Sequence, residues 1–202
     1  MELIVISLIG YLIGAVPFAF VIGKVFYHTD VRQHGSGNLG GSNTGRVLGK
    51  KAGLAVMTLD LLKVTLVVFL AETFCAHPWA VALGGVSAGL GHCYPVFVRF
   101  RGGKAVATMY GFLFGLWVCV GYSPLTFFLP LAVFLGILFR TRIVSLSSMV
   151  SAVVGMLYLW CTAAHLPVKA AVTVYALLVV FRHSENIRRL RRKIENKIRW
   201  LG

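Results

Sequence analysis

Long apolar stretches alternate with short polar ones along the whole chain, and this pattern indicates a bundle of membrane-spanning helices. Seven apolar stretches cover residues 3–22, 54–71, 79–98, 105–120, 125–139, 143–164 and 168–181. A helix needs about 20 residues to cross a hydrocarbon core about 30 Å thick. The shorter stretches therefore require snorkelling side chains, local bilayer thinning or partial insertion. The predicted fold class is an all-α, polytopic transmembrane helix bundle of about seven spans, with five or six spans as the alternative.

Composition supports a membrane protein with a single domain. The chain has 202 residues, of which 58% are hydrophobic and 13% charged, whereas soluble domains carry about 25% charged residues. A cleavable signal peptide would begin with basic residues, but this chain starts Met1-Glu2 and its first lysine, Lys24, follows the first apolar stretch. We therefore expect one integral-membrane domain over residues 1–202, with residues 183–202 as a basic, amphipathic cytoplasmic tail.

The basic residues predict how the bundle is oriented, because Lys and Arg accumulate in cytoplasmic loops. With seven spans and the N-terminus outside, 18 of the 20 Lys and Arg residues fall on the cytoplasmic side, together with the C-terminus. Only Lys169 lies outside, and Lys63 lies within a span. The net charge of +14 is then explained by topology and by anionic lipid headgroups. We expect membrane lipids as partners and no nucleic acid.

The end of the chain has the pattern of a helix that lies on the inner leaflet. Between Ser184 and Trp200, apolar residues recur every three or four positions in a sequence that is otherwise strongly basic. They are Ile187, Leu190, Ile194 and Ile198.

The first polar stretch that stands out is HGSGNLGGSNTGR, from His34 to Arg46, which contains five glycines. Glycines let backbone N–H groups converge on an anion, and an arginine offers a planar fork of donors to a phosphate. A flexible polar loop is the alternative interpretation. The candidate phosphate ligands are Ser36, Gly37, Asn38, Asn43 and Arg46.

Two further polar stretches fall on the same predicted side of the membrane. HCYPVFVRFRGGK runs from His92 to Lys104, and FRHSENIRRL runs from Phe181 to Leu190. Basic residues are common at this surface, and a lone histidine is usually a packing residue. Convergence of the three stretches, however, would form one basic pocket of phosphate size. It would add Gly102, Gly103, Lys104, His183 and Asn186 to the site, and Ser145, which follows Arg142 on the same side, would join them.

Asp60 and Lys63 are the two charged residues in the middle of the second apolar stretch. They are three residues apart, so both lie on one helical face. An isolated charge at this depth is expensive, so a partner is expected. The sequence leaves open whether the pair only fixes helix packing or also acts next to a ligand.

The three polar stretches resemble the motifs of the bacterial integral-membrane glycerol-3-phosphate acyltransferases of the PlsY type. GSGNLGGSNTGR is similar to the first motif of that family, GHCYPVFVRFRGGKAVAT to the second, and RHSENIRRL with the later Glu195 to the third. The order and spacing match over the whole chain. Small departures are Gly41-Ser42 in place of Ala-Thr, Ala105 in place of glycine, and Gly45 in place of a bulkier residue.

The resemblance implies transfer of a fatty acyl group from acyl phosphate to the 1-hydroxyl of sn-glycerol 3-phosphate. The products would be lysophosphatidic acid and phosphate, in the first step of phospholipid synthesis. The expected location is the bacterial cytoplasmic (inner) membrane, with the site at the cytoplasmic face and functional coupling to an acyl-phosphate-producing enzyme. His183 is expected to polarise the hydroxyl and Asn186 to orient it, with Lys104 beside them, although a substrate phosphate is a rival proton acceptor. No cofactor and no metal are expected.

Two other classes of function remain open at this point. Intramembrane charges and helices interrupted by glycine also suit a membrane transporter of a phosphorylated solute. A lipid-binding subunit without turnover is the third possibility.

Overall fold

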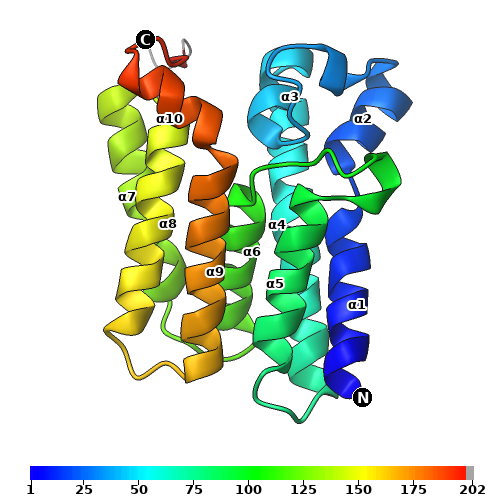
Figure 1. Cartoon of the computed structure of the whole chain (residues 1–202), viewed down its shortest axis with the longest axis vertical. Coiled ribbons are helices and arrows are strands. Elements are labelled where there is room, and N and C mark those ends of the chain that lie inside the picture. Colours follow the sequence, from blue (N-terminus) through cyan, green and yellow to red (C-terminus); the bar gives the residue numbers. More distant parts are fainter. Residues whose placement is uncertain (199–202) are drawn as a thin grey trace.

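The computed structural model describes residues 1–198, and these form an elongated bundle of α-helices (Figure 1). None of the described residues lies in a β-strand, so the all-α prediction is confirmed. The α-helices are α1 (Glu2–Ala15), α2 (Phe18–Tyr27), α3 (Gly41–Leu48), α4 (Lys50–Phe74), α5 (Ala80–Cys93), α6 (Val106–Val118), α7 (Leu125–Thr141), α8 (Val144–Trp160), α9 (Leu166–Arg182) and α10 (Ser184–Arg191). Two 3₁₀ turns, η1 (Val31–Gln33) and η2 (Val96–Val98), lie in loops.

Three helical segments are long and apolar enough to cross a membrane, namely 2–27, 50–74 and 80–98. A fourth qualifies if the bent pair α9 and α10 counts as one span. The apolar helices α6, α7 and α8 have 13, 17 and 17 residues, so they are about 20 to 26 Å long. In Figure 1 these shorter helices stand beside the longer ones, and the N-terminus lies at the opposite end of the bundle from the described C-terminal segment.

The first predicted span is not one helix. Pro17 cannot donate a backbone hydrogen bond, and it disfavours helical geometry in the residue before it. Val16 is accordingly extended, α1 ends at Ala15 and α2 begins at Phe18. The prediction of one helix over residues 3–22 is corrected to two helices, and the carbonyl of Val16 between them accepts from the backbone N–H of Phe18 at 3.2 Å.

Small residues let the helices approach one another closely. A Cβ on Gly53 of α4 would lie 2.6 Å from the Cα of Gly45 and 2.8 Å from the carbonyl oxygen of Gly41, both in α3. The unusual glycines at positions 41 and 45 therefore match a close crossing of α3 over α4. Small-residue contacts of this kind are the common way in which membrane helices pack.

The interior and the outer surface of the bundle are both apolar. Val67, Phe112, Leu116 and Tyr175 are among the fully buried side chains of the core. Large apolar residues on the outside remain exposed; examples are Leu8, Leu62, Phe69, Phe139 and Leu177. An apolar outer surface of this size fits a protein whose surroundings are lipid rather than water.

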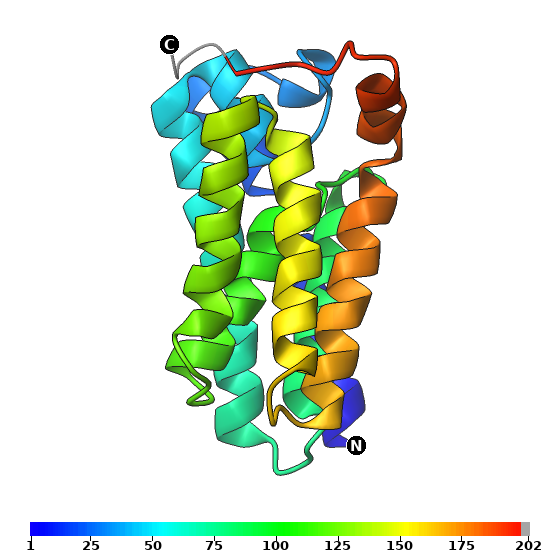
Figure 2. The same cartoon turned by 90° about the vertical axis from the view of Figure 1, so that its left-hand side faces the viewer.

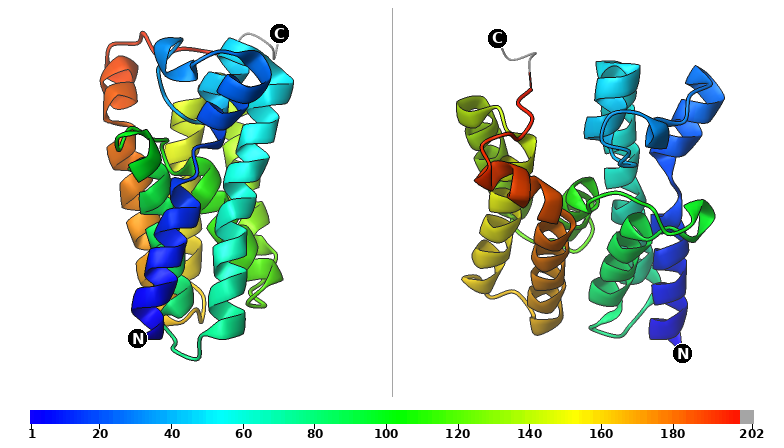
Figure 3. Two further views of the ribbon diagram at one scale, coloured as in Figure 1. Left: turned by 90° about the vertical axis from the view of Figure 1, so that its right-hand side faces the viewer. Right: turned by 45° about the horizontal axis from the view of Figure 1, so that its top comes forward.

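The polar end of the molecule gathers α2, α3, α10 and the C-terminal segment, as both views in Figure 3 show. The helix at the C-terminus ends at Arg191, and the chain then crosses the top of the bundle without helical structure (Figure 2). There the backbone N–H of Ile198 donates to the carbonyl of Arg142 at 2.9 Å. The prediction of a continuous helix to Trp200 is therefore wrong from residue 192 to residue 198, and Trp200 lies outside the described residues.

Candidate functional site

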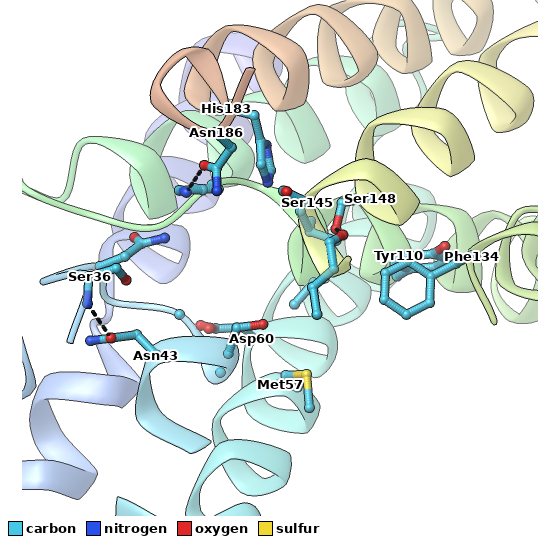
Figure 4. A pocket seen from close by; sticks show the side chains of 18 of the residues that line it. Ser36, Asn43, Met57, Asp60, Tyr110, Phe134, Ser145, Ser148, His183 and Asn186 are labelled. Carbon is cyan, nitrogen blue, oxygen red and sulfur yellow. Dashed lines mark hydrogen bonds between the residues drawn. The ribbon is translucent and has the colours of Figure 1, made fainter. Parts of the chain in front are cut away.

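A cavity of about 380 Å³ opens at the polar end of the bundle and extends down between α4, α6 and α7 (Figure 4). Its mouth is lined by residues of the loop before α3, of α3 itself and of the C-terminal segment, and its deeper wall by apolar side chains. The predicted site residues that line it are Ser36, Asn38, Asn43, Arg46, Asp60, Lys104, Ser145, His183 and Asn186. The expected convergence of the three polar stretches is therefore confirmed.

Four of the predicted residues do not line this cavity: Gly37, Gly102, Gly103 and Lys63. Gly37 instead borders a second depression, together with Arg32 and Arg99. Gly102 and Gly103 are bound through their backbone, because the guanidinium of Arg182 donates to both carbonyls, at 3.3 and 3.1 Å.

The first polar stretch forms a loop that leads into the short helix α3, and hydrogen bonds of the Asn43 side chain fix the conformation of this loop. The backbone N–H of Ser36 donates to Oδ1 of Asn43 at 2.8 Å. Both N–H groups of the Asn43 side chain are used as well, on the carbonyls of Val31 and His34 at 3.0 and 3.2 Å. Asn43 is 2% exposed, so its amide is committed to the loop. Ser36, Asn38 and Arg46 line the same cavity, and Arg46 is an exposed cation at its mouth.

The second polar stretch brings Lys104 to the cavity at the start of α6. Ala105, the residue that caps α6, has a φ of 59°, in the left-handed region where a side chain costs about 1 to 2 kcal/mol and glycine costs nothing. The family whose second motif this stretch resembles usually has glycine at this position. The side chain of Lys104 donates to Oδ1 of Asn186 in a short contact. Burial lowers the pKa of Lys104, and the positive charge of Arg189 lowers it further.

Glu195 lines the cavity but was not among the predicted site residues. Its carboxylate accepts hydrogen bonds from Ser145 Oγ at 2.9 Å, Asn186 Nδ2 at 2.5 Å and Arg189 Nε at 2.7 Å. Burial would raise the pKa of Glu195, but these donors outweigh burial and hold it below the ordinary value. Two signals in the sequence pointed to it, namely its association with the third motif and its acidic character in a strongly basic tail. Its position depends on the chain crossing back over the bundle, which no local pattern encodes.

A prediction about stability follows from the different positions of Glu195 and Glu185. Both carboxylates contact Arg189, but the side chain of Glu195 is 6% exposed and that of Glu185 is 78% exposed. We expect Glu195→Ala to destabilise the fold by about 1.5 to 3 kcal/mol, the range for hydrogen bonds to charged groups. Glu185→Ala should have little effect. Thermal unfolding of the purified variants in detergent measures the difference, and equal midpoints would contradict the assigned role of Glu195.

His183 caps the C-terminal end of α9 and presents one ring nitrogen to the cavity. Its Nδ1 lies 2.7 Å from the carbonyl oxygen of Val179. A carbonyl can only accept, so Nδ1 carries the proton and Nε2 is a bare acceptor. Burial lowers the pKa of His183 to about 4, and the positive charges of Lys104 and Arg182 contribute. The imidazole is therefore neutral near pH 7. Figure 4 shows His183 and Asn186 on the opposite side of the cavity from Asp60.

Asp60 and Lys63 form the expected ion pair, with 2.7 Å between Oδ1 and Nζ, and a third residue joins them. His92 of α5 places its Nδ1 3.2 Å from the same ammonium, which also donates to the carbonyl of Val16 at 3.0 Å. The pair thus fixes the packing of α1, α4 and α5. Asp60 and His92 also line the cavity, so both interpretations of the pair are supported.

The deeper wall of the cavity is apolar and partly aromatic. Tyr110 of α6 meets Phe127 and Phe134 of α7 edge to face, with ring centroids 6.0 and 6.2 Å apart. Its hydroxyl is satisfied by the carbonyl of Pro130 at 3.1 Å. Together with Met57 these rings present no free polar group. A ligand that fits the whole cavity needs an anionic end at the mouth and an apolar chain at depth.

Comparison with known proteins connects this geometry to an activity. The family model described as glycerol-3-phosphate acyltransferase matches residues 4–193. A glycerol-3-phosphate acyltransferase of Geobacillus kaustophilus (strain HTA426) is 46% identical over 199 residues, which is 98% of this chain and 96% of the relative. Glycerol-3-phosphate acyltransferase 3 of Bacillus anthracis is 47% identical over 193 residues, 94% of this chain and 92% of the relative.

Two solved structures have the same fold. Both are crystal structures of PlsY, an integral membrane glycerol 3-phosphate acyltransferase, one in the glycerol 3-phosphate form and one in the lysophosphatidic acid form. The first is 35% identical with a TM-score of 0.91 and covers 100% of this chain and 98% of its own. The second is 34% identical with a TM-score of 0.88 and covers 98% and 96%.

Proposed function

The chain belongs to the glycerol-3-phosphate acyltransferase family, and from this premise we propose how its cavity transfers an acyl group to glycerol 3-phosphate. The donor is acyl phosphate, the acceptor atom is the 1-hydroxyl, and the products are lysophosphatidic acid and phosphate. The observation that carries the proposal is the two-part cavity, in which Arg46 and Lys104 stand at one end and aromatic rings at the other. Family membership favours this enzyme over a solute transporter.

The phosphate groups of both substrates bind at the mouth of the cavity. Ser36, Asn38, Arg46 and Lys104 supply the donors, since phosphate requires convergent N–H and O–H groups and positive charge. Other predicted residues do not bind phosphate themselves but fix the loops that carry these donors, through hydrogen bonds of the loop backbone. They are Asn43, Gly37, Gly102 and Gly103. Ser145 and Glu195 hold Asn186 in the same manner. The acyl chain lies along Met57, Tyr110 and Phe134.

His183 takes the proton of the attacking hydroxyl at its bare Nε2, and Asn186 orients the same group. The hydroxyl oxygen bonds to the carbonyl carbon of the donor, and the bond from that carbon to the phosphate oxygen then breaks. Phosphate leaves with the electron pair, and it is a stable anion that needs little help from a general acid. Catalysis then consists mainly of positioning and charge stabilisation, and no cofactor or metal takes part.

Lys104 gives the sharpest test of the phosphate site. We expect Lys104→Ala to lower kcat/KM about 10- to 150-fold, because a hydrogen bond to a charged group contributes about 1.5 to 3 kcal/mol. Arg46→Ala should fall in the same range. Arg101→Ala, an exposed residue of the same loop as Lys104 that does not line the cavity, is the matched control. Steady-state kinetics with varied glycerol 3-phosphate measure the effect. Unchanged kinetics in both site variants would refute the shared phosphate site.

The donor is tested by comparing acyl phosphate with acyl-CoA as substrate for the purified protein. We expect lysophosphatidic acid from labelled glycerol 3-phosphate with acyl phosphate, and less with acyl-CoA. Product formed only from acyl-CoA would refute the proposed donor but not the acyltransferase family.

The location follows from topology and charge. We place the chain in the bacterial inner membrane with seven spans, the N-terminus outside and the cavity mouth at the cytoplasmic face. The polar end carries most of the cationic loops, which favours that face. An enzyme that produces acyl phosphate would then be the functional partner on the same side. Labelling of single cysteines introduced near each terminus in intact cells tests the orientation.

A further inference from the structure

Two histidines line the cavity, and the mechanism above uses only His183. His92 is 6% exposed and belongs to the buried cluster with Asp60 and Lys63. Its ring lies against the loop that carries Lys104, because a Cβ built on Gly103 would fall 1.9 Å from His92 Nε2. The backbone N–H of Gly103 also donates to the carbonyl of His92 at 3.0 Å. The imidazole is thus fixed beside the residue that precedes Lys104.

The protonation of the His92 ring follows from the partner of its Nδ1. An ammonium group has three N–H donors and no lone pair. Lys63 Nζ donates to Val16 O at 3.0 Å, and it lies 3.2 Å from His92 Nδ1 and 2.7 Å from Asp60 Oδ1, with which it forms an ion pair. His92 Nδ1 therefore accepts, and in the neutral ring the proton sits on Nε2. The other arrangement would need Nδ1–H to reach Asp60 Oδ1 at 3.5 Å, beyond the usual hydrogen-bond range of about 2.7 to 3.2 Å.

The two histidines of the cavity consequently have opposite tautomers. His183 carries its proton on Nδ1, held by Val179, and offers a lone pair at Nε2. His92 offers Nε2–H, and no described residue accepts a hydrogen bond from it. His92 lines the cavity, so we expect a group of a bound ligand to accept this hydrogen bond.

We propose that His92 is a further catalytic residue, whose Nε2–H donates a hydrogen bond to the acyl carbonyl oxygen of the donor. This inference rests on the proposed function. Asp60, beside His92, lines the cavity on α4, and Figure 4 shows it between Ser36 and Asn43 on one side and the apolar side chains of Met57 and Phe134 on the other. The carbonyl of an acyl phosphate likewise joins the phosphate to the chain, so it falls at this boundary.

The Nε2–H group of His92 acts on the negative charge that develops on the carbonyl oxygen during the reaction. When the hydroxyl oxygen bonds to the carbonyl carbon, the π electrons of the C=O bond move onto its oxygen, and the hydroxyl proton goes to His183 Nε2. His92 Nε2–H stabilises the resulting oxyanion. The C=O bond then re-forms and the phosphate leaves. Lys63 and Asp60 are positioning residues, because they hold the ring in the tautomer that donates.

The tautomer itself is tested without any substrate. NMR of the ¹⁵N-histidine-labelled protein in detergent, with His92→Gln used to assign the signal, should show a neutral His92 ring protonated at Nε2. A ring protonated at Nδ1, or a doubly protonated ring, overturns the proposal. The tautomer is read from the wild-type spectrum, and the variant serves only to assign the signal.

The catalytic role is tested by a matched pair of substitutions. The amide nitrogen of glutamine can reach the position of Nε2, whereas asparagine reaches only that of Nδ1. We expect His92→Asn to lower kcat about 10²- to 10³-fold, the usual loss for one oxyanion donor, with KM for glycerol 3-phosphate unchanged. His92→Gln should retain at least tenfold more kcat than His92→Asn. Equal losses in both variants, or a change confined to KM, contradict the role.

Failure of the proposed function gives a different result. If acyl phosphate were not the donor, the wild-type protein would be inactive with it and active with acyl-CoA. The His92→Asn and His92→Gln variants would then be assayed with acyl-CoA as the donor. The NMR result does not depend on which donor is used.

Discussion

Replacing His183 with alanine is expected to lower kcat by about 10²- to 10⁴-fold, the range for loss of a positioned general base. The bare Nε2 is the feature that alanine removes, while Val179 loses only a hydrogen-bond donor to its carbonyl. Single-turnover measurements with acyl phosphate and glycerol 3-phosphate separate this chemical step from substrate binding. Turnover near the wild-type rate would identify a substrate phosphate as the proton acceptor.

The pH profile of the wild-type enzyme distinguishes the same two mechanisms. Burial lowers the pKa of His183 to about 4, so the base is present above that pH and is lost as the pH falls through it. A His183-dependent rate should therefore stay level between about pH 5 and 8 on this account. A substrate phosphate, whose second pKa is about 6, would lose its basic form below about pH 6. A fall in kcat near pH 6 would favour the substrate phosphate.

Replacing Lys63 with methionine is expected to destabilise the protein by about 3 to 5 kcal/mol. Removing one partner of a buried ion pair leaves the other charge uncompensated, and the side chains of Lys63 and Asp60 are 3% and 2% exposed. Nδ1 of His92 loses its donor as well, and the carbonyl of Val16 loses one of its two donors. For a chain of this length the apparent unfolding midpoint should fall by about 6 to 20 °C.

The controls for Lys63 separate lost charge pairing from lost packing. The double variant Asp60→Asn, Lys63→Met removes both charges, so it should recover much of the stability that the single variant loses. Lys51→Met changes an exposed lysine at the start of the same helix and should leave the midpoint unchanged. A double variant no more stable than Lys63→Met would show that the ion pair is not what the lysine supplies.

Some of the candidate site could be predicted because its residues sit in local patterns. The glycine-rich stretch before Arg46, the Gly102–Lys104 turn and the pair His183 and Asn186 each stand out from an apolar background. Their convergence followed from helix topology, which places all of them at one end of the bundle. The motif resemblance supplied the substrates.

Other parts of the site could not be predicted, because they depend on contacts between residues far apart in the sequence. Glu195 reaches Ser145 across 50 positions, and Lys63 reaches Val16 and His92 across 47 and 29. A hydrogen bond through space leaves no periodicity in the chain. The hydrogen bonds that Asn43 makes to its own loop also needed the structure, since no pattern in the sequence shows which backbone groups its amide meets.

By itself the sequence determined the helices and the end of the bundle at which polar groups gather, because apolar surface must face lipid or core and charge must avoid both. Only the tertiary structure decided which polar groups meet. It returned Glu195 over the cavity, and it gave Nδ1 of His183 a carbonyl acceptor and Nδ1 of His92 an ammonium donor. The tautomer of an imidazole depends on its neighbours in space, and these are fixed only when the helices have packed.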